Sequence, residues 1–419
     1  MKLFQQMLVA SAAIGLIAPI GAQANDINIE GMNSYSRSKS SSKKQQFNSK
    51  TFANELATVN EKIDGLETQF NDFEAGSFSD TTVLDGKAIF DVGSVDTDDD
   101  TYTGETQFMY TYTMNLNTSF TGDDNLYTRI KTGNHSSWSK TKSVYNTYLS
   151  SGNGNGDELK VDKLWYTTPV GENHTITFGP KIENYYMHAT TPSIYEPVLK
   201  AFTLGGNAAA YGASTSPGAG WAYTADNGFA VSSNVTTQKG NTSTGILTNQ
   251  GKTSWATQVG YTKPTYSVSA LVNMKYNGWT DSYFMSTDGK ARAGDGNSTN
   301  IGLRGWWRPS NSDTAMPSVS VGFDTSETDA STNSNTTAYF VGLNWTDVIN
   351  ADDKIGIAFG QPQKAEGETI DPFLYEVYYK YSVNDSVTVT PTIFGGTSKN
   401  SSDVETDMTG YLVQTTFKF

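Results

Sequence analysis

Apolar and polar side chains alternate along most of this chain, and this alternation limits its fold more than any other feature. It starts near residue 78 and returns after each polar loop until Phe419. A period of two places neighbouring side chains on opposite faces of an extended strand. In 107–120, for example, Phe108, Tyr110 and Tyr112 share one face, whereas the other face carries mainly Thr and Asn. The alternation therefore predicts an all-β fold.

Sixteen segments show this pattern. They are 82–93, 107–120, 125–131, 159–169, 174–181, 218–224, 228–236, 254–262, 266–276, 300–308, 318–324, 336–345, 354–360, 373–381, 386–394 and 407–419. A strand as long as 107–120 exceeds what an ordinary soluble sheet uses, but it suits a tilted membrane crossing with an extension.

The connections between these segments alternate in length. Tight turns rich in Gly, Asn and Asp occupy 121–124, 170–173, 225–228, 263–264 and 383–385. Long polar loops lie between them, at 132–157, 182–217, 237–252, 277–298, 325–335, 361–371 and 395–406. Only 309–317 and 346–353 are longer than expected for the short side. An even number of strands with loops sorted by length predicts a 16-stranded antiparallel transmembrane β-barrel over 77–419.

The composition agrees with a membrane barrel. The chain has 23 Tyr, 20 Phe and 8 Trp among many polar residues, as expected when an apolar outer face surrounds a wet interior. It has no Cys, so disulfides and thiolate metal sites are excluded. Its net charge of −14 argues against nucleic acid as a partner.

The N-terminal region has the pattern of an exported protein. Residues 1–24 are expected to form a signal peptide, with Lys2, an apolar stretch over 8–20 and a small-residue cleavage site ending at Ala24. A membrane anchor is the alternative, but the apolar run is short for a span. Residues 25–50 are rich in Ser and Lys, which predicts a flexible tract. A solvated linker is the simpler interpretation of the tract, and weak contact with an anionic cell-wall polymer is the other.

Residues 51–76 carry a heptad repeat in place of the alternation. Apolar side chains recur in steps of four and three, at Phe52, Leu56, Val59, Ile63, Leu66, Phe70 and Phe73. These steps predict a coiled-coil helix. Three heptads are marginal for an isolated helix, so we expect a periplasmic stalk that associates into a homotrimer. Packing against its own chain is the alternative.

A barrel of sixteen strands is wide enough for a water-filled channel. A strand charge facing lipid at mid-membrane costs about 2–4 kcal/mol, so charged positions in strands are expected to face the lumen. The candidate pore-lining or constriction residues are Arg129, Lys131, Lys181, Glu183, His188, Glu196, Lys200, Arg304, Glu376 and Lys380. We treat a plain solvated position as the alternative for each of them.

The loop 182–217 is the candidate constriction, because it is richer in apolar residues than the other loops. We expect it to fold into the barrel and to face a basic wall made by Arg129, Lys181 and Arg304, which creates a transverse field. The alternative is a loop packed over the outer rim. The sign of the ion preference and the permeant solute stay open at this point.

Catalysis finds little support in the sequence. The three histidines, His135, His174 and His188, are far apart, and neither metal-ligand spacing nor a Gly-x-Ser-x-Gly motif occurs. We therefore expect no enzyme activity, metal or cofactor. The functional alternative is a structural envelope protein with a plugged barrel that spaces the outer membrane from the cell wall. An outer-membrane hydrolase is a third hypothesis.

Several short motifs resemble cyanobacterial outer-membrane porins, the iron-uptake porins related to carbohydrate-selective porins. The matching segments are the start 1–6, 63–67, 164–166, 169–171, 176–180, 355–362, 383–385, 390–394 and the end 415–419. The resemblance implies a trimer that permits passive diffusion of small solutes, which could be inorganic nutrients, iron or sugars. Such porins usually carry a surface-layer-homology module between signal and stalk, and here only the tract 25–50 occupies that place.

Overall fold

The computed structural model describes residues 81–135, 146–212, 214–279, 284, 296–310, 316–329, 334–399 and 404–419. The predicted signal peptide, the Ser/Lys-rich tract and the coiled-coil stalk lie outside the described residues, so these three expectations remain predictions. Among the described residues, no helix is long and apolar enough to span a membrane.

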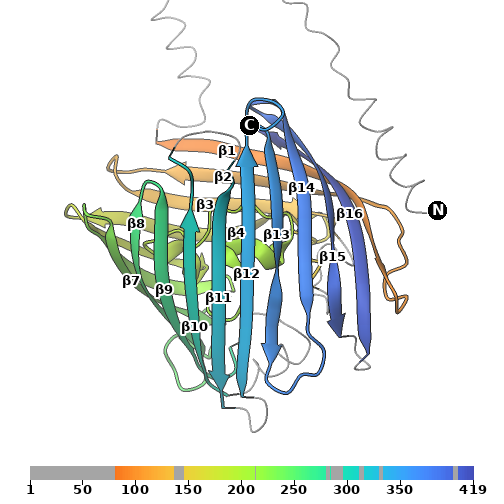
Figure 1. The fold of residues 1–419 in the computed structure, drawn as a ribbon. Coiled ribbons are helices and arrows are strands. Elements are labelled where there is room, and N and C mark those ends of the chain that lie inside the picture. Colours follow the sequence, from red (N-terminus) through yellow and green to blue (C-terminus); the bar gives the residue numbers. More distant parts are fainter. Residues whose placement is uncertain are drawn as a thin grey trace, which may run out of the picture. The chain divides into compact units, whose positions relative to one another are not determined.

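Sixteen antiparallel strands form one closed barrel (Figure 1). They are β1 (Thr82–Thr97), β2 (Gln107–Thr118), β3 (Asn125–Gly133), β4 (Lys160–Val170), β5 (His174–Ile182), β6 (Ser216–Thr224), β7 (Phe229–Gln238), β8 (Lys252–Lys263), β9 (Tyr266–Lys275), β10 (Ser298–Trp307), β11 (Ser318–Thr328), β12 (Asn335–Thr346), β13 (Lys354–Ala365), β14 (Phe373–Asn384), β15 (Val387–Lys399) and β16 (Glu405–Lys418). Each strand pairs with its neighbour in sequence, and β16 pairs with β1. The predicted number and order of strands are confirmed.

The alternation sorts the side chains between the two faces of the barrel wall. In β2, Met109 and Thr111 are buried against the interior, whereas Phe108 of the same strand is 70 % exposed on the outside. Leu303 and Val321 on neighbouring strands are also exposed on the outer face. An outer band of apolar side chains is what a barrel presents to lipid.

The two ends of the sheet close on each other through their backbones. The N–H of Gly86 donates to the carbonyl of Phe419 at 2.9 Å, and the N–H of Phe419 donates back at 3.1 Å. The ring of Phe419 stacks on Tyr112 with the centroids 5.7 Å apart. Closure leaves the barrel without a free strand edge, which removes the main route to edge-to-edge aggregation.

Short turns and long loops lie at opposite ends of the strands. In the turn from β2 to β3, the carboxylate of Asp124 accepts hydrogen bonds from the N–H groups of Phe120 and Thr121, both at 2.8 Å. In the turn from β12 to β13, the carboxylate of Asp353 likewise accepts hydrogen bonds from backbone N–H groups. Several strands extend further toward the long-loop end than the alternation of apolar and polar residues predicted. Polar residues at that end continue the backbone hydrogen bonds between neighbouring strands. β13, for example, continues to Ala365 past a register shift in β12.

Candidate functional site

The connection from β5 to β6 runs inside the barrel, and we call its residues 183–212 the inner loop. Figure 1 shows its yellow-green ribbon within the ring of strands. It contains two short 3-10 helices, η2 (Asn184–Met187) and η3 (Lys200–Gly205). Its apolar side chains are buried, including Leu199 and Phe202, both with no exposed surface. The sequence analysis expected an inward position for this segment, and the apolar content that suggested it is what packs there.

Eight consecutive strands, from β7 to β14, each bind the inner loop through a side chain. The residues are Ser232, Gln258, Asn273, Arg304, Ser320, Asn344, Gln363 and Glu376, and each bonds to a backbone group of the loop. Because the loop offers backbone polar groups along its length and the wall supplies matching donors and acceptors, the loop is fixed against one half of the barrel wall.

Arg304 in β10 is the strongest of these anchors. Its Nε donates to the carbonyl of Leu204 and its Nη2 donates to that of Gly206, both at 2.8 Å. The same Nη2 lies 2.8 Å from the carboxylate of Asp324 in β11. Its guanidinium also lies 4.5 Å from the ring centroid of Tyr211. Arg304 therefore sits beneath the inner loop, and the expectation that it forms a basic wall facing the loop across the pore is wrong.

Glu376 in β14 is also an anchor, although the sequence analysis placed it on the pore wall. Its carboxylate accepts the N–H groups of Leu199 at 2.7 Å and Val198 at 3.2 Å, together with the hydroxyl of Tyr195 at 2.9 Å. The side chain is fully buried. A buried carboxylate that accepts three hydrogen bonds holds the loop rather than a passing solute.

Two predicted residues of the inner loop have different surroundings. Glu196 is 44 % exposed and forms ion pairs with Lys354 and Lys380 at the short-turn end. His188 packs against the wall, with its Nδ1 3.4 Å from the hydroxyl of Ser232. Glu196 and Lys380 are thus brought together as a charged group open to solvent, whereas His188 is a packing residue.

The wall opposite the anchors, formed by β1 to β4, carries a second charged group. The Nε of Arg129 donates to the carboxylate of Asp162 at 2.6 Å. Lys163 pairs with Glu183 at the start of the inner loop. Asp162 and Lys163 are adjacent in sequence, yet both take part, because the register between β3 and β4 shifts at this point. Such a bulge places two residues opposite one and re-aims a side chain.

Lys131 and Lys200 complete a basic cluster with Arg129, Lys163 and Lys87 of β1. The positive charges of Arg129 and Lys200 lie close enough to both Lys131 and Lys163 to repel them. Among the described residues, Asp162 and Glu183 are the carboxylates that form ion pairs with members of the cluster. Arg129, Lys131 and Lys200 are half-buried and Lys87 is exposed, whereas Lys163 is fully buried.

Four aromatic rings lie next to this basic cluster. Tyr127 packs on Trp165 with centroids 4.4 Å apart, and Trp165 packs on Tyr186 at 4.6 Å. Tyr186 continues to Tyr185 at 4.5 Å. The ammonium of Lys163 lies 4.4 Å from the centroid of Tyr186. The stack joins the barrel wall to the inner loop, and its tilted rings are in the contact range of favourable aromatic pairs.

Lys181 is not among the residues brought to the interior. It is exposed, and its Nζ donates to the carbonyl of Val161 at 2.7 Å. The next residue, Ile182, is the buried one and packs with Trp165 and Met187. A register shift between Gly179 and Ile182 changes the alternation at this point, so the predicted basic wall of Arg129, Lys181 and Arg304 does not exist.

Sequence reasoning missed Lys163, Asp162, Asp324 and Gln363. The bulge between β3 and β4 breaks the period of two at Asp162 and Lys163, so the period alone does not bring both side chains into the same charged group. Asp324 was a polar residue at a strand end with no visible partner in the sequence. The one available signal was that charges in strands must face inward, and it applied to Asp162, Lys163 and Asp324. Gln363 is uncharged and lay in the predicted loop 361–371, so no signal identified it.

A second loop packs against the inner loop. The N–H of Ser150 donates to the carbonyl of Val198 at 2.8 Å, and the N–H of Lys200 donates to that of Tyr148 at 2.7 Å.

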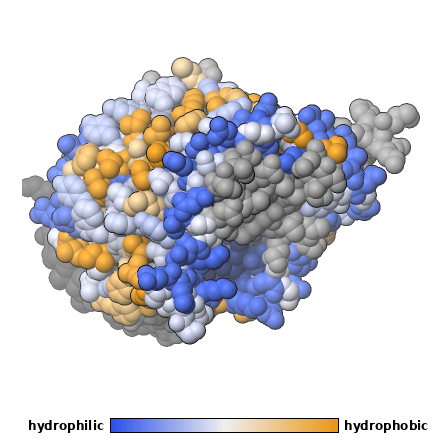
Figure 2. Space-filling view, turned by 90° about the horizontal axis from the view of Figure 1, so that it is seen from below, coloured by the Kyte–Doolittle hydropathy of each residue, from blue (hydrophilic) through white to orange (hydrophobic). Residues whose placement is uncertain are grey.

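The described residues contain no group of His, Cys, Asp and Glu that could hold a metal. Figure 2, seen from the lower side of Figure 1, shows hydrophilic residues bordering a hollow in this face.

Comparison with solved structures defines the class of this barrel. It is similar to the high-pH structure of Pseudomonas putida OprB, with a TM-score of 0.58 and 11 % identity over 81 % of this chain and 94 % of that chain. It is also similar to Vibrio cholerae OmpT, an outer membrane protein, with a TM-score of 0.51 and 13 % identity over 81 % of this chain and 99 % of that chain. These likenesses identify a porin-type barrel.

The family follows from the sequence match. Residues 38–397 match the carbohydrate-selective porin family OprB, so the chain belongs to this family and is an outer-membrane porin. An uncharacterized protein of Nostoc sp. is 24 % identical over 88 % of this chain and 70 % of its own length. An uncharacterized protein of Synechocystis sp. is 32 % identical over 30 % of this chain and 24 % of its own length. The resemblance to outer-membrane porins stated from the motifs is confirmed.

Proposed function

We propose that the chain forms a water-filled channel for passive diffusion, with its constriction between the inner loop and the wall of β1 to β4. The anchoring of the loop to eight consecutive strands carries this proposal. These bonds hold the loop inside the lumen, and in this proposal its free side faces Arg129 and Lys131. A fixed loop gives a constriction of fixed size, and a fixed size is what lets a porin select by size and charge.

The charge of the constriction supports a preference for anionic and neutral hydrophilic solutes. Two of the five cationic side chains of the basic cluster, Arg129 and Lys163, form ion pairs with Asp162 and Glu183, and a pore lined by Arg and Lys favours anions. The stack from Tyr127 to Tyr185 adds flat apolar faces on which a sugar ring can pack. The description of the family as carbohydrate-selective supports sugars among these solutes. Small sugars and oxyanions are therefore the first candidates, ahead of iron salts.

Planar-bilayer recordings test the channel and its preference together. Discrete current steps support a channel, and the reversal potential in a salt gradient gives the sign of the ion preference. Addition of a neutral sugar should reduce the current if the sugar dwells at the constriction. A correctly inserted protein without current steps would contradict the proposal.

One observation favours a second candidate, a plugged barrel that serves as an envelope spacer. An apolar cluster crosses part of the interior, from Val95 and Met109 on one wall through Leu199 to Phe340 and Leu374 on the other. This cluster closes a sector of the lumen near the long-loop end. The same recordings separate the candidates, because the spacer conducts no ions.

We also propose a homotrimer whose stalk, residues 51–76, lies in the periplasm. The Vibrio neighbour is described as a trimer form, and the first strand starts beside the short turn from β2 to β3. The apolar heptad positions supply a surface for self-association. The predictions below include a test of this part.

A further inference from the structure

A pocket lies on the outside of the barrel where β7, β8 and β9 meet their long loops. Val235 and Trp255 line it from the strands, and both alternate with buried inward residues, so both face away from the lumen. The pocket holds about 470 Å³, which is within the range of small-molecule sites. Its other lining residues come from the loops and the strand ends, and they are Leu247, Thr248, Asn249, Gly251, Thr253, Tyr276, Asn277 and Asn297.

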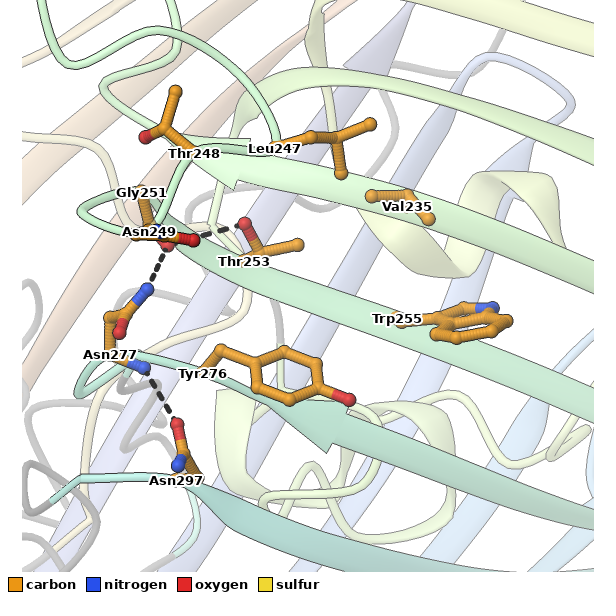
Figure 3. Close-up of a pocket in the computed structure, with 10 residues that line it drawn as sticks. All are labelled: Val235, Leu247, Thr248, Asn249, Gly251, Thr253, Trp255, Tyr276, Asn277 and Asn297. Atoms are coloured by element: carbon orange, nitrogen blue, oxygen red, sulfur yellow. Dashed lines mark hydrogen bonds between the residues drawn. The ribbon is translucent and has the colours of Figure 1, made fainter.

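The pocket has an apolar half and a polar half. Figure 3 shows Val235, Trp255 and the ring of Tyr276 on one side, with the amides of Asn249, Asn277 and Asn297 on the other. The apolar half continues the outer band of the barrel, and the polar half belongs to the loops. A membrane protein is expected to bind an amphiphile at such a border, because its tail and its head group each meet a matching surface.

Hydrogen bonds hold the side chains of the polar half in place. Asn277 donates through Nδ2 to the carbonyl of Gly251 at 2.7 Å, and its N–H donates to Oδ1 of Asn297 at 3.2 Å. These bonds hold two loops together and orient both amides. The exposed carboxamide of Asn249 has no hydrogen-bond partner among the described residues. Amides that both donate and accept match a head group rich in hydroxyls.

The apolar half presents fixed aromatic surfaces. The indole N–H of Trp255 donates to the hydroxyl of Ser233 at 3.0 Å, which fixes the ring while leaving the side chain 46 % exposed. Leu247 is 70 % exposed at the pocket, with its backbone at a φ of 57°. A leucine held in the left-handed region and left exposed is costly in water, but it gains contacts when an acyl chain covers it.

None of the ten described lining residues carries a charge. Lys252 lies next in sequence to the lining residue Thr253, and its ammonium donates to the carbonyl of Gly278 at 2.9 Å. Among the described lining residues, a phosphate head group would find amides but no cationic partner, whereas an uncharged sugar needs none. The described lining therefore favours a neutral polar head.

We propose that this pocket binds a sugar-headed lipid of the surrounding leaflet. The sugar hydroxyls bond to the amides of Asn249 and Asn277, the sugar ring packs on Tyr276, and the acyl chains follow Trp255 and Val235. The opening on the outer face selects a lipid over a free sugar, because a soluble sugar gains nothing from the apolar half. The site is separate from the channel, so its failure would leave the proposed function untouched.

Native mass spectrometry of the full mature chain, stripped of lipid in detergent, tests the proposal. The probes are a glucosyl diacylglycerol, phosphatidylglycerol and phosphatidylcholine with identical acyl chains, and methyl glucoside as the free head group. We expect the glucosyl lipid to bind at least tenfold more tightly than the other three. Trp255→Ala and Asn249→Ala should each reduce that preference severalfold, and both side chains are exposed enough for the barrel to fold without them.

Trp307→Ala is the matched control, because Trp307 is 39 % exposed on the outer face at the opposite end of β10. It should leave the preference unchanged. Equal binding of all three lipids, preference for phosphatidylglycerol, or equally tight binding of methyl glucoside would each overturn the proposal. Since the chain has no Cys, Leu247→Cys can carry a single label. Shielding of that label in the oligomer without lipid would assign the pocket to a contact between copies, which also overturns the proposal.

Discussion

The guanidinium of Arg304 in β10 lies 2.8 Å from the carboxylate of Asp324 in β11, and the two side chains are 0 % and 2 % exposed. Both side chains lie on the inner face of the barrel wall, and Arg304 binds the inner loop there. Its position makes it part of the support of the constriction rather than of the surface that a solute meets.

Arg304→Met should loosen the inner loop. The change leaves Asp324 as an unpaired buried charge and removes the donors to Leu204 and Gly206, and loss of one partner of a buried pair costs about 3–5 kcal/mol. We expect a lower unfolding midpoint, noisier single-channel current and faster cleavage by trypsin at Lys200. Arg308→Met is the control, because its Nε donates to the carbonyl of Pro264 at an exposed site. Quiet, wild-type current from Arg304→Met would contradict the anchoring.

Glu376→Leu should also loosen the inner loop, at residues that precede the part bound by Arg304. It removes the acceptor of the N–H groups of Val198 and Leu199, and each buried donor left without a partner costs about 1–3 kcal/mol. We expect loss of stability in denaturant and increased hydrogen exchange at residues 195–200. Glu366→Leu, in a loop, serves for comparison and should change neither measurement. If exchange at 195–200 stays as slow as in the wild type, the carboxylate does not hold the loop.

Arg129→Glu should shift the ion preference of the channel toward cations. The change replaces a positive by a negative charge beside the remaining lysines of the basic cluster, and lumen charges set selectivity. The measurement is the reversal potential in a salt gradient. Lys181→Glu makes the same charge change on an exposed side chain that the structure places away from the interior, and it should leave the reversal potential unchanged. Equal shifts from both variants would remove Arg129 from the constriction.

Asp124→Asn should destabilise the barrel in a pH-dependent way. The hydrogen bond from the hydroxyl of Tyr166, together with those from Ser119 and the turn N–H groups, holds the pKa of Asp124 well below its usual range, against the opposing effect of burial. A carboxyl group with a lowered folded-state pKa stabilises the fold above its unfolded-state pKa and loses this contribution as the pH falls through the folded-state pKa.

The unfolding midpoint of Asp124→Asn should therefore lie below that of the wild type at pH 7, and the gap should narrow once the pH falls below about 4. Asp123→Asn changes the neighbouring exposed carboxyl group in the same turn and should show no such gap. A gap for Asp124→Asn that does not change with pH would mean that the charge of its carboxylate is not the cause.

Deletion of 51–74 should leave a folded barrel and weaken the trimer. The heptad positions are removed, while the closed sheet keeps all its backbone pairs. The oligomer mass in detergent, measured by light scattering, should fall at dilutions where the full chain stays assembled. Deletion of 25–50 is the control, because it removes a stretch of similar length that lacks the heptad repeat. An unchanged mass after removal of the stalk segment would show that the barrel alone holds the copies together.

The sequence by itself determined the barrel and its strands. Side chains that alternate between apolar and polar can satisfy both lipid and water only in strands, and the backbone groups of those strands are all paired only if the sheet closes. The count of sixteen and the sorting of turns from loops followed from this local rule, and the inward position of segment 182–217 followed from its apolar content. The inward direction expected for Arg129 and Lys131 rests on the same rule, and their place at a constriction stays a prediction.

The tertiary structure alone decided which inward residues hold the inner loop. The alternation predicts that Arg304, Glu376 and Arg129 all point inward. It does not predict which parts of the chain contact them inside the barrel. Arg304 and Glu376 are covered by the backbone of the inner loop, which is distant in sequence, while Arg129 is not. Lys181 was assigned to the inner face, and the structure places it on the exposed side, because the register shift beside it depends on the partner strand. The period of two in the sequence determines whether a side chain points into or out of the barrel. Only the packing of the folded chain determines which residues that side chain contacts.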